Sequence, residues 1–172
     1  MGDIYIKQLD KGDYEAFAEL RTLGLATDPQ AFWASKEEEG PELKQKFADR
    51  IAHPFNFSLG AFVSGQLVGI MSFNRYGQYK LSFKGDIVGV YVHPDFRGMK
   101  IGDQLLAATI EKAFAIEGVT KLTLTVTASN TTAKGLYEKY GFIEYGFEKR
   151  GMRVGDTYYD QFFMHLEKEN RK

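Results

Sequence analysis

The first half of the chain alternates between strand-like and helix-like hydrophobic patterns. Ile4 and Ile6 alternate with polar neighbours, which predicts a short opening strand. An apolar stripe from Tyr14 to Leu25 then predicts a helix, with Asp10 or Gly12 available as its cap. Three further elements are predicted: a second helix within residues 35–52, a hairpin of residues 55–63 and 66–73 around a Ser-Gly turn, and a strand over residues 86–92.

The second half repeats this alternation. Residues 105–114 carry apolar side chains at helical spacing, with Gly118 placed to end that helix, and KLTLTVT at 121–127 alternates as a strand. Asn130 can cap another helix that Gly141 terminates. Two last strands, 142–149 and 158–166, flank a turn. The resulting order, β-α-α-β-β-β-α-β-α-β-β, requires one parallel crossover in an otherwise antiparallel sheet.

This order predicts an α+β fold with three layers. We expect a mixed, mostly antiparallel central sheet of six to seven strands, flanked by about four helices. The length of 172 residues, without repeats or a linker, predicts one domain over residues 1–172.

Composition narrows the classes of partner. The net charge of -1 gives no global basic field for nucleic acid or an anionic membrane. Neither a signal-peptide core nor an apolar run of membrane-spanning length occurs, so a cytoplasmic protein is expected. The absence of cysteine removes disulfides, thiolate metal sites and a cysteine nucleophile, and no metal-ligand spacing is found.

The most distinctive segment is VHPDFRGMKIGDQLL, which passes from a predicted strand into a predicted helix. A helix amino terminus after a strand presents free N–H groups and partial positive charge to an anion. Gly98 and Gly102 let the backbone approach, and Arg97 and Lys100 add charge. The segment therefore indicates a pyrophosphate cradle, with a tight turn carrying two solvated cations as the alternative. It matches neither the dinucleotide fingerprint nor a P-loop.

Together with LTLTVTASNTTAKGLYEKYGF, this segment resembles the acyl-CoA-binding core of the GCN5-related N-acetyltransferases. Their first motif, Arg/Gln-x-x-Gly-x-Gly/Ala, fits at Arg97 and Gly102, with Lys100 where glycine is usual. If Lys100 takes a positive φ, a side chain there costs about 1–2 kcal/mol. The second motif fits at Asn130, Ala133, Leu136, Tyr137, Gly141 and Phe142.

The resemblance implies the acyl-CoA N-acyltransferase fold and transfer of the acetyl group of acetyl-CoA to a primary amine by direct attack. It implies that the pantetheine arm lies along Val90, Tyr91 and Val92, with the Val92 N–H as oxyanion donor. Asn130 would anchor this arm or only cap its helix, and Tyr137 would protonate the departing thiolate or only pack in the core. Pyrophosphate binding would fall to Arg97, Gly98, Met99, Lys100, Ile101, Gly102 and Asp103.

The general base and the acceptor are less defined. Some relatives carry a glutamate where this chain has Thr125, which cannot act as a base. Carboxylates that remain as candidates are Asp86, Glu37, Glu38, Glu39 and Glu138, each with a solvated carboxylate as the alternative. On the acceptor side we expect Phe32, Trp33, Glu38 and Asp86.

Several alternatives stay open. A non-catalytic acyl-CoA-binding module would share the fold, and a nucleic-acid-binding domain using Arg97 and Lys100 is disfavoured by the net charge. The acceptor is a peptide amino terminus or a small-molecule amine. The final strands offer edges for a homodimer.

Overall fold

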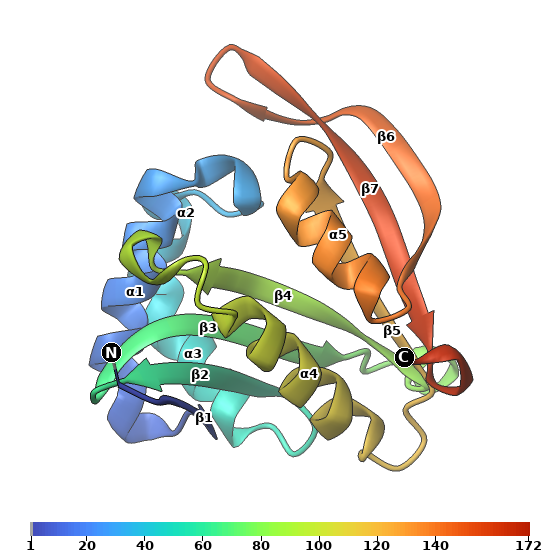
Figure 1. The fold of residues 1–172 in the computed structure, drawn as a ribbon, viewed down its shortest axis with the longest axis horizontal. Coiled ribbons are helices and arrows are strands. Elements are labelled where there is room, and N and C mark those ends of the chain that lie inside the picture. Colours follow the sequence, from blue (N-terminus) through green and yellow to red (C-terminus); the bar gives the residue numbers. More distant parts are fainter. Residues whose placement is uncertain (1) are drawn as a thin grey trace.

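The strands of the computed structural model, which describes residues 2–172, form one sheet (Figure 1). Its strands are β1 (Ile4–Gln8), β2 (Phe57–Val63), β3 (Gln66–Arg75), β4 (Lys84–Val92), β5 (Lys121–Thr127), β6 (Ile143–Val154) and β7 (Thr157–Glu167). Its helices are α1 (Tyr14–Thr27), the single turn α2 (Lys36–Glu39), α3 (Leu43–Ala52), α4 (Ile101–Phe114) and α5 (Thr131–Lys139).

The sheet has seven strands in the order β1-β2-β3-β4-β5-β7-β6. All neighbouring pairs are antiparallel except β4 and β5, which α4 connects as a crossover. The predicted mixed, mostly antiparallel sheet is therefore confirmed, with seven strands rather than six. Among the described residues four helices have nine residues or more, which agrees with the predicted number.

Two hydrophobic clusters hold helices on opposite faces of the sheet, which gives the three predicted layers. On one face, Leu105 and Leu106 of α4 pack with Met71 and Phe73 of β3, and α5 joins the same cluster. The other cluster joins α1 and α3 to β3 and β4 through Phe17, Leu20, Phe47, Ile70 and Tyr91. In Figure 1, α4 and α5 lie in front of the sheet and α1 and α3 behind it. Among residues 2–172, no helix has the length and apolar character to cross a bilayer.

The helix predicted within residues 35–52 is divided in two. Gly40 and Pro41 form a short 3-10 turn between α2 and α3, because proline cannot donate the hydrogen bond that a continuous helix needs. Elsewhere the boundaries shift by a few residues: α4 ends at Phe114, four residues before Gly118. The last two strands run further than predicted, as far as the two-residue turn at Gly155 and Asp156.

Candidate active site

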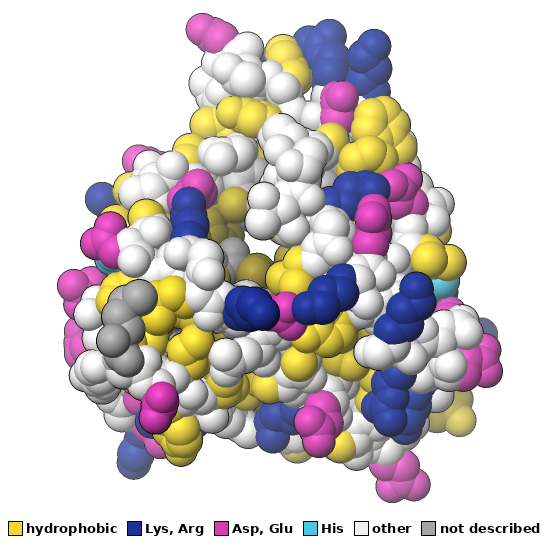
Figure 2. Space-filling view, viewed as in Figure 1, with side chains coloured by type: hydrophobic (Ala, Val, Ile, Leu, Met, Phe, Trp, Pro, Cys, Tyr) yellow, Lys and Arg dark blue, Asp and Glu magenta, His cyan; other side chains and the backbone are white. Residues whose placement is uncertain are grey.

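The parallel strands β4 and β5 separate soon after they meet. Their pairing runs only from Lys84 opposite Lys121 to Asp86 opposite Thr123, although β4 continues to Val92. The His93 N–H donates to the Val68 carbonyl at 2.8 Å. Backbone groups along an antiparallel pair alternate in direction, so those of Tyr91 also point toward β3. The backbone groups of Val92 consequently face the opening between β4 and β5, called the gap below. Figure 2 shows the surface hollowed between α5 and the end of β4.

A β-bulge interrupts β4 beside the gap. Ser72 pairs with Val88 and Ile70 with Tyr91, so β4 has one residue more than β3 across this stretch. Gly89 has a φ of +63°, a conformation that side chains rarely adopt. Bulges are common next to active sites because they turn neighbouring backbone groups away from the ladder.

The segment Arg97–Asp103, called the cradle, leads from β4 into α4. Gly98 has a φ of +83° and Lys100, the N-cap residue of α4, a φ of +61°. Lys100 therefore has a positive φ at the position where glycine is usual, and a side chain in this left-handed conformation costs about 1–2 kcal/mol. Ile101 is fully buried and Met99 packs against the core, so these two residues offer backbone N–H groups rather than side chains to a ligand.

Two charged side chains of the cradle already have partners. Arg97 donates through Nε to the Val92 carbonyl and through Nη2 to Asp28, both at 3.0 Å. Asp103 accepts hydrogen bonds from Lys139 and from the Tyr140 hydroxyl, which lower its pKa below the ordinary value. Asp103 thus ties α4 to the end of α5. The ammonium of Lys100, the N-cap residue of α4, has no ion pair within residues 2–172.

Helix α5 places Asn130 and Tyr137 on the same side of the sheet as the cradle. Asn130 caps α5 by accepting from the Ala133 N–H at 3.2 Å, which leaves its amide nitrogen for another contact. Tyr137 is 5% exposed and meets the Phe142 ring edge-on at 5.9 Å between centroids. Burial raises the pKa of Tyr137 to about 12, so this phenol stays protonated throughout the neutral range.

On the opposite face lies a cavity of about 410 Å³, called the central cavity. The loop before α2, strands β4 to β7 and α1 all contribute to its wall. Its lining consists of Arg21, Ala31, Phe32, Trp33, Ala34, Tyr76, Asp86, Ile87, Val88, Gly89, Thr123, Leu124, Thr125, Tyr145 and Phe163. Since Gly89 belongs to both the cavity wall and the bulge, the cavity and the gap are adjacent.

Asp86 is the central carboxylate of this cavity. Its Oδ2 accepts from the Tyr76 hydroxyl at 3.0 Å and its Oδ1 from the Thr123 hydroxyl. Burial, and then the hydrogen bond to Asp86, raise the pKa of Tyr76. The carboxylate is therefore held in one orientation at the point where β4 and β5 separate.

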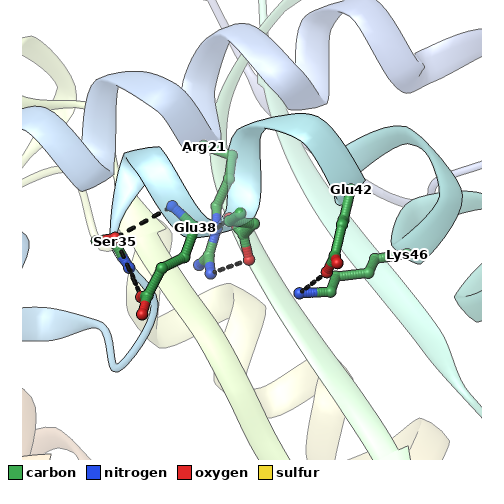
Figure 3. Close-up of polar contacts among 6 residues, drawn as sticks. Arg21, Ser35, Glu38, Glu42 and Lys46 are labelled. Carbon is green, nitrogen blue, oxygen red and sulfur yellow. Dashed lines mark hydrogen bonds and ion pairs between the residues drawn. The ribbon is translucent and has the colours of Figure 1, made fainter.

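The other predicted acceptor-side residues divide into two groups. Phe32 and Trp33 line the central cavity, Phe32 buried and Trp33 73% exposed. Glu38 instead forms a capping box with Ser35 at the start of α2 (Figure 3), and its hydrogen bonds from Ser35 lower its pKa. Of the other candidate bases, Glu39 pairs with Arg21 and Glu138 with Lys134. Asp86 alone among these named carboxylates lines the cavity.

Sequence reasoning did not single out Arg21, Tyr76, Gly89, Tyr145 or Phe163. Two of them carried a signal. Arg21 occupies a core-facing position of α1, four residues after Phe17 and four before Leu25, where an arginine needs a buried partner. Gly89 interrupts the apolar run of β4, and a glycine inside a strand often marks a bulge.

These features fit an acyl-CoA ligand: a strand gap for an extended arm, and a helix amino terminus with open backbone for a pyrophosphate. The architecture is the acyl-CoA N-acyltransferase fold. The model of the acetyltransferase (GNAT) family matches residues 20–142, and the chain belongs to this family, the GCN5-related N-acetyltransferases. It is an acyltransferase, and its acyl donor is acetyl-CoA.

Two relatives share moderate sequence identity with the chain. The chain is 33% identical over 108 residues to the N-alpha-acetyltransferase RimI of Mycobacterium tuberculosis, a match that covers 63% of this chain and 65% of that relative. It is 25% identical to the L-amino acid N-acetyltransferase AaaT of Escherichia coli, over 95% of this chain and 98% of AaaT.

Solved structures support the fold. YncA of Salmonella typhimurium, solved with its cofactor acetyl-CoA, superposes with a TM-score of 0.86 at 20% identity, over 97% of this chain and 95% of YncA. A GNAT-family acetyltransferase of Streptococcus pneumoniae gives 0.81 at 23% identity, over 96% of this chain and 99% of that one.

Proposed function

We propose that the protein transfers the acetyl group of acetyl-CoA to a primary amine by direct attack of the amine on the thioester, without a covalent enzyme intermediate. The observation that carries the proposal is the junction at Gly89, where the gap between β4 and β5 meets a cavity that holds one fixed carboxylate, Asp86. A donor on one side of this junction and an amine on the other would meet at the bulge.

The donor side is built mainly from backbone. Bound acetyl-CoA supplies the activated thioester. The free N–H groups of the cradle at the start of α4 would hold its pyrophosphate, with the Lys100 ammonium beside them. The amide nitrogen of Asn130 would contact the pantetheine arm. The N–H of Val92 would face the thioester oxygen and stabilise the negative charge that develops there.

Two side chains would handle protons. The amine is mostly protonated at neutral pH and must lose a proton before it attacks. Asp86, which lines the central cavity, would receive this proton directly or through water. Tyr137, protonated because burial raises its pKa, would return a proton to the departing thiolate.

The acceptor class is narrowed by similarity only to amines. RimI is named for acetylating α-amino groups and AaaT for L-amino acids. A protein amino terminus and a small-molecule amine are therefore both compatible with the relatives.

We further propose a cytoplasmic homodimer, in which the exposed Ile143, Tyr145 and Phe147 of the edge strand β6 are covered. Light scattering over a concentration series tests the dimer.

The absence of cysteine makes the function simple to test. A thiol reagent reports the release of CoA without a background from the protein, so a panel of amines can be screened directly. Micromolar binding of acetyl-CoA in calorimetry, with amine-dependent release of CoA and an acetylated product in mass spectrometry, is the expected result. Binding without amine-dependent release across the panel would favour the alternative, an acyl-CoA-binding module. No binding of acetyl-CoA would contradict the proposal.

A further inference from the structure

A buried ion pair fixes an arginine at the edge of the central cavity. Arg21 of α1 binds the Glu39 carboxylate through Nε at 2.7 Å and Nη2 at 2.9 Å. Both side chains are nearly buried, with exposed fractions of 12% and 10%. Figure 3 shows Arg21 reaching from α1 to α2 to make this contact. A fork of two parallel hydrogen bonds fixes the plane of the guanidinium as well as its position.

The same geometry leaves one nitrogen directed at the junction. The Arg21 guanidinium lies over the Phe32 ring, with its Cζ 4.5 Å from the ring centroid, so Phe32 covers one of its faces. Its Nη1 lies 3.5 Å from the point where a Cβ of Gly89 would be, and within residues 2–172 it has no hydrogen-bond acceptor. Because Arg21 and Gly89 both line the central cavity, Nη1 is a donor toward the cavity and the bulge.

The charge around this donor is positive. Arg50 of α3 lies close enough to Arg21 for their repulsion, after burial, to lower the pKa of Arg50. Its Nε binds the neutral amide oxygen of Asn74 at 3.0 Å. Glu39 thus binds only Arg21, and Arg50 has a neutral hydrogen-bond partner. The excess positive charge disfavours a second ammonium beside Arg21 and favours an anion there.

We infer that the acceptor is an amine with a carboxylate on the neighbouring carbon, a free α-amino acid, and that Arg21 Nη1, positioned by Glu39, binds this carboxylate. The inference rests on the proposed acetyl transfer and names its substrate class. The amino and carboxylate groups of an α-amino acid share one carbon and lie about 3 Å apart. A carboxylate on Nη1, beside Gly89, therefore keeps the amine in the part of the central cavity that adjoins the gap.

The rest of the cavity fits this class. Asp86 lies three residues before Gly89 in the same cavity and supplies negative charge for the ammonium, so the cavity carries both signs, as a zwitterion requires. An apolar wall for an uncharged substrate side chain is provided by Phe32, Trp33, Tyr145 and Phe163. A polyamine would bring a second cation toward Arg21 and Arg50. A peptide amino terminus would offer a neutral carbonyl instead of a carboxylate.

The decisive comparison is between amino acids and their amides. We would measure kcat/KM for L-leucine, L-methionine, L-phenylalanine and L-glutamine, for the four amino acid amides, for spermidine and for a tripeptide. Each amide keeps the shape and loses the charge. Its amine also loses a proton more readily, so intrinsic reactivity favours the amide. A preference for at least one free acid of roughly 10- to 100-fold is expected, the size of a lost charged hydrogen bond.

Two variants connect this preference to Arg21. Arg21→Lys keeps the charge but lacks the fork, so KM for the amino acid should rise about 10-fold or more with little change in kcat. Arg21→Gln combined with Glu39→Gln removes both charges and avoids leaving a buried ion unpaired. In both, the acid-to-amide ratio should fall toward one. Glu42→Gln, which changes an exposed carboxylate paired with Lys46, is the matched control and should keep the ratio.

The ratio is measured within one protein, so a lower folded fraction does not affect it. Equal or better use of amides, spermidine or the tripeptide would overturn the inference, as would a ratio unchanged by the variants, and acetyl transfer itself would stand. Calorimetry with the protein saturated with CoA separates the two proposals. Binding of an amino acid but not of its amide, lost in Arg21→Lys, would support the carboxylate site even without turnover, and binding of neither would overturn it.

Discussion

The two sides of the β4–β5 gap differ in whether backbone groups or side chains form them. On the proposed donor side, backbone groups would provide most of the contacts: Val92 in the gap, and Gly98 and Lys100, which have positive φ before α4. On the acceptor side, side chains from distant segments meet in the central cavity, among them Arg21, Asp86 and Phe163. A backbone site constrains a short local sequence, whereas a side-chain site can change its residues without changing the fold.

This difference predicts that donor-side changes affect every acceptor equally, and the largest effect is expected at Tyr137. In Tyr137→Phe, kcat should fall by about 100-fold or more, the usual contribution of a positioned acid, while the Kd of acetyl-CoA stays unchanged. The ring still packs against Phe142, so the fold is kept. Stopped-flow turnover and calorimetry measure the two quantities.

The pH profile gives a second check on Tyr137. Since its pKa is raised to about 12, ionisation of this phenol should not lower kcat below about pH 11 in the wild-type protein. A kcat in Tyr137→Phe within threefold of wild type would leave Tyr137 with a packing role only.

On the acceptor side, Asp86→Asn should lower kcat/KM about 10- to 100-fold without changing acetyl-CoA affinity. Asparagine keeps the size of the side chain and can still accept one hydrogen bond from Tyr76 or Thr123, so the cavity wall should remain in place. If Asp86 accepts the proton of the amine, raising the pH should recover part of the lost rate. A loss that is the same at every pH would assign Asp86 to substrate binding rather than proton transfer.

The same contrast explains how much could be predicted from the sequence. The cradle and the helix capped by Asn130 are local, and their motifs indicated the fold, the family and acetyl-CoA as acyl donor, all of which are confirmed. Alternating hydrophobicity predicted the strand Lys121–Thr127 with its observed bounds. Local patterns were sufficient wherever the structure depends on neighbouring residues.

The central cavity could be predicted only in part. Phe32, Trp33 and Asp86, which the sequence predicts on the acceptor side, all line it, but the run of three glutamates at 37–39 gave no means of separating its members. Glu38 is an exposed cap and Glu39 a buried partner of Arg21, a difference made by a residue of α1 that lies 18 positions earlier in the chain. Contacts of that kind depend on the packing of helices, which periodicity in a single sequence does not determine.

Lys100 allows the donor side to be separated into conformation and charge. Lys100→Gly removes the strain of a side chain at φ +61° and should stabilise the protein by about 0.5–1 kcal/mol, part of the gain being lost to the greater freedom of glycine in the unfolded chain. Lys100→Ala is the matched control, since it removes the same charge and keeps the strained backbone. Urea unfolding measures the stability. If the ammonium contacts the pyrophosphate, both variants should weaken acetyl-CoA binding by a similar factor.

The smallest effect is expected where Asp103 joins α4 to α5. Lys139 and Tyr140 hold the pKa of Asp103 below its ordinary value, and the unfolded chain has a pKa near 3.9. The contact therefore stabilises the protein fully above about pH 4 and is lost as the pH falls through the lower, folded-state pKa. Because the pair lies near the surface, Asp103→Asn should cost only about 0.2–1 kcal/mol at pH 7. The difference from wild type in urea unfolding should shrink between pH 4 and pH 2; a difference that stays constant would mean that the carboxylate charge contributes nothing to the joint between α4 and α5.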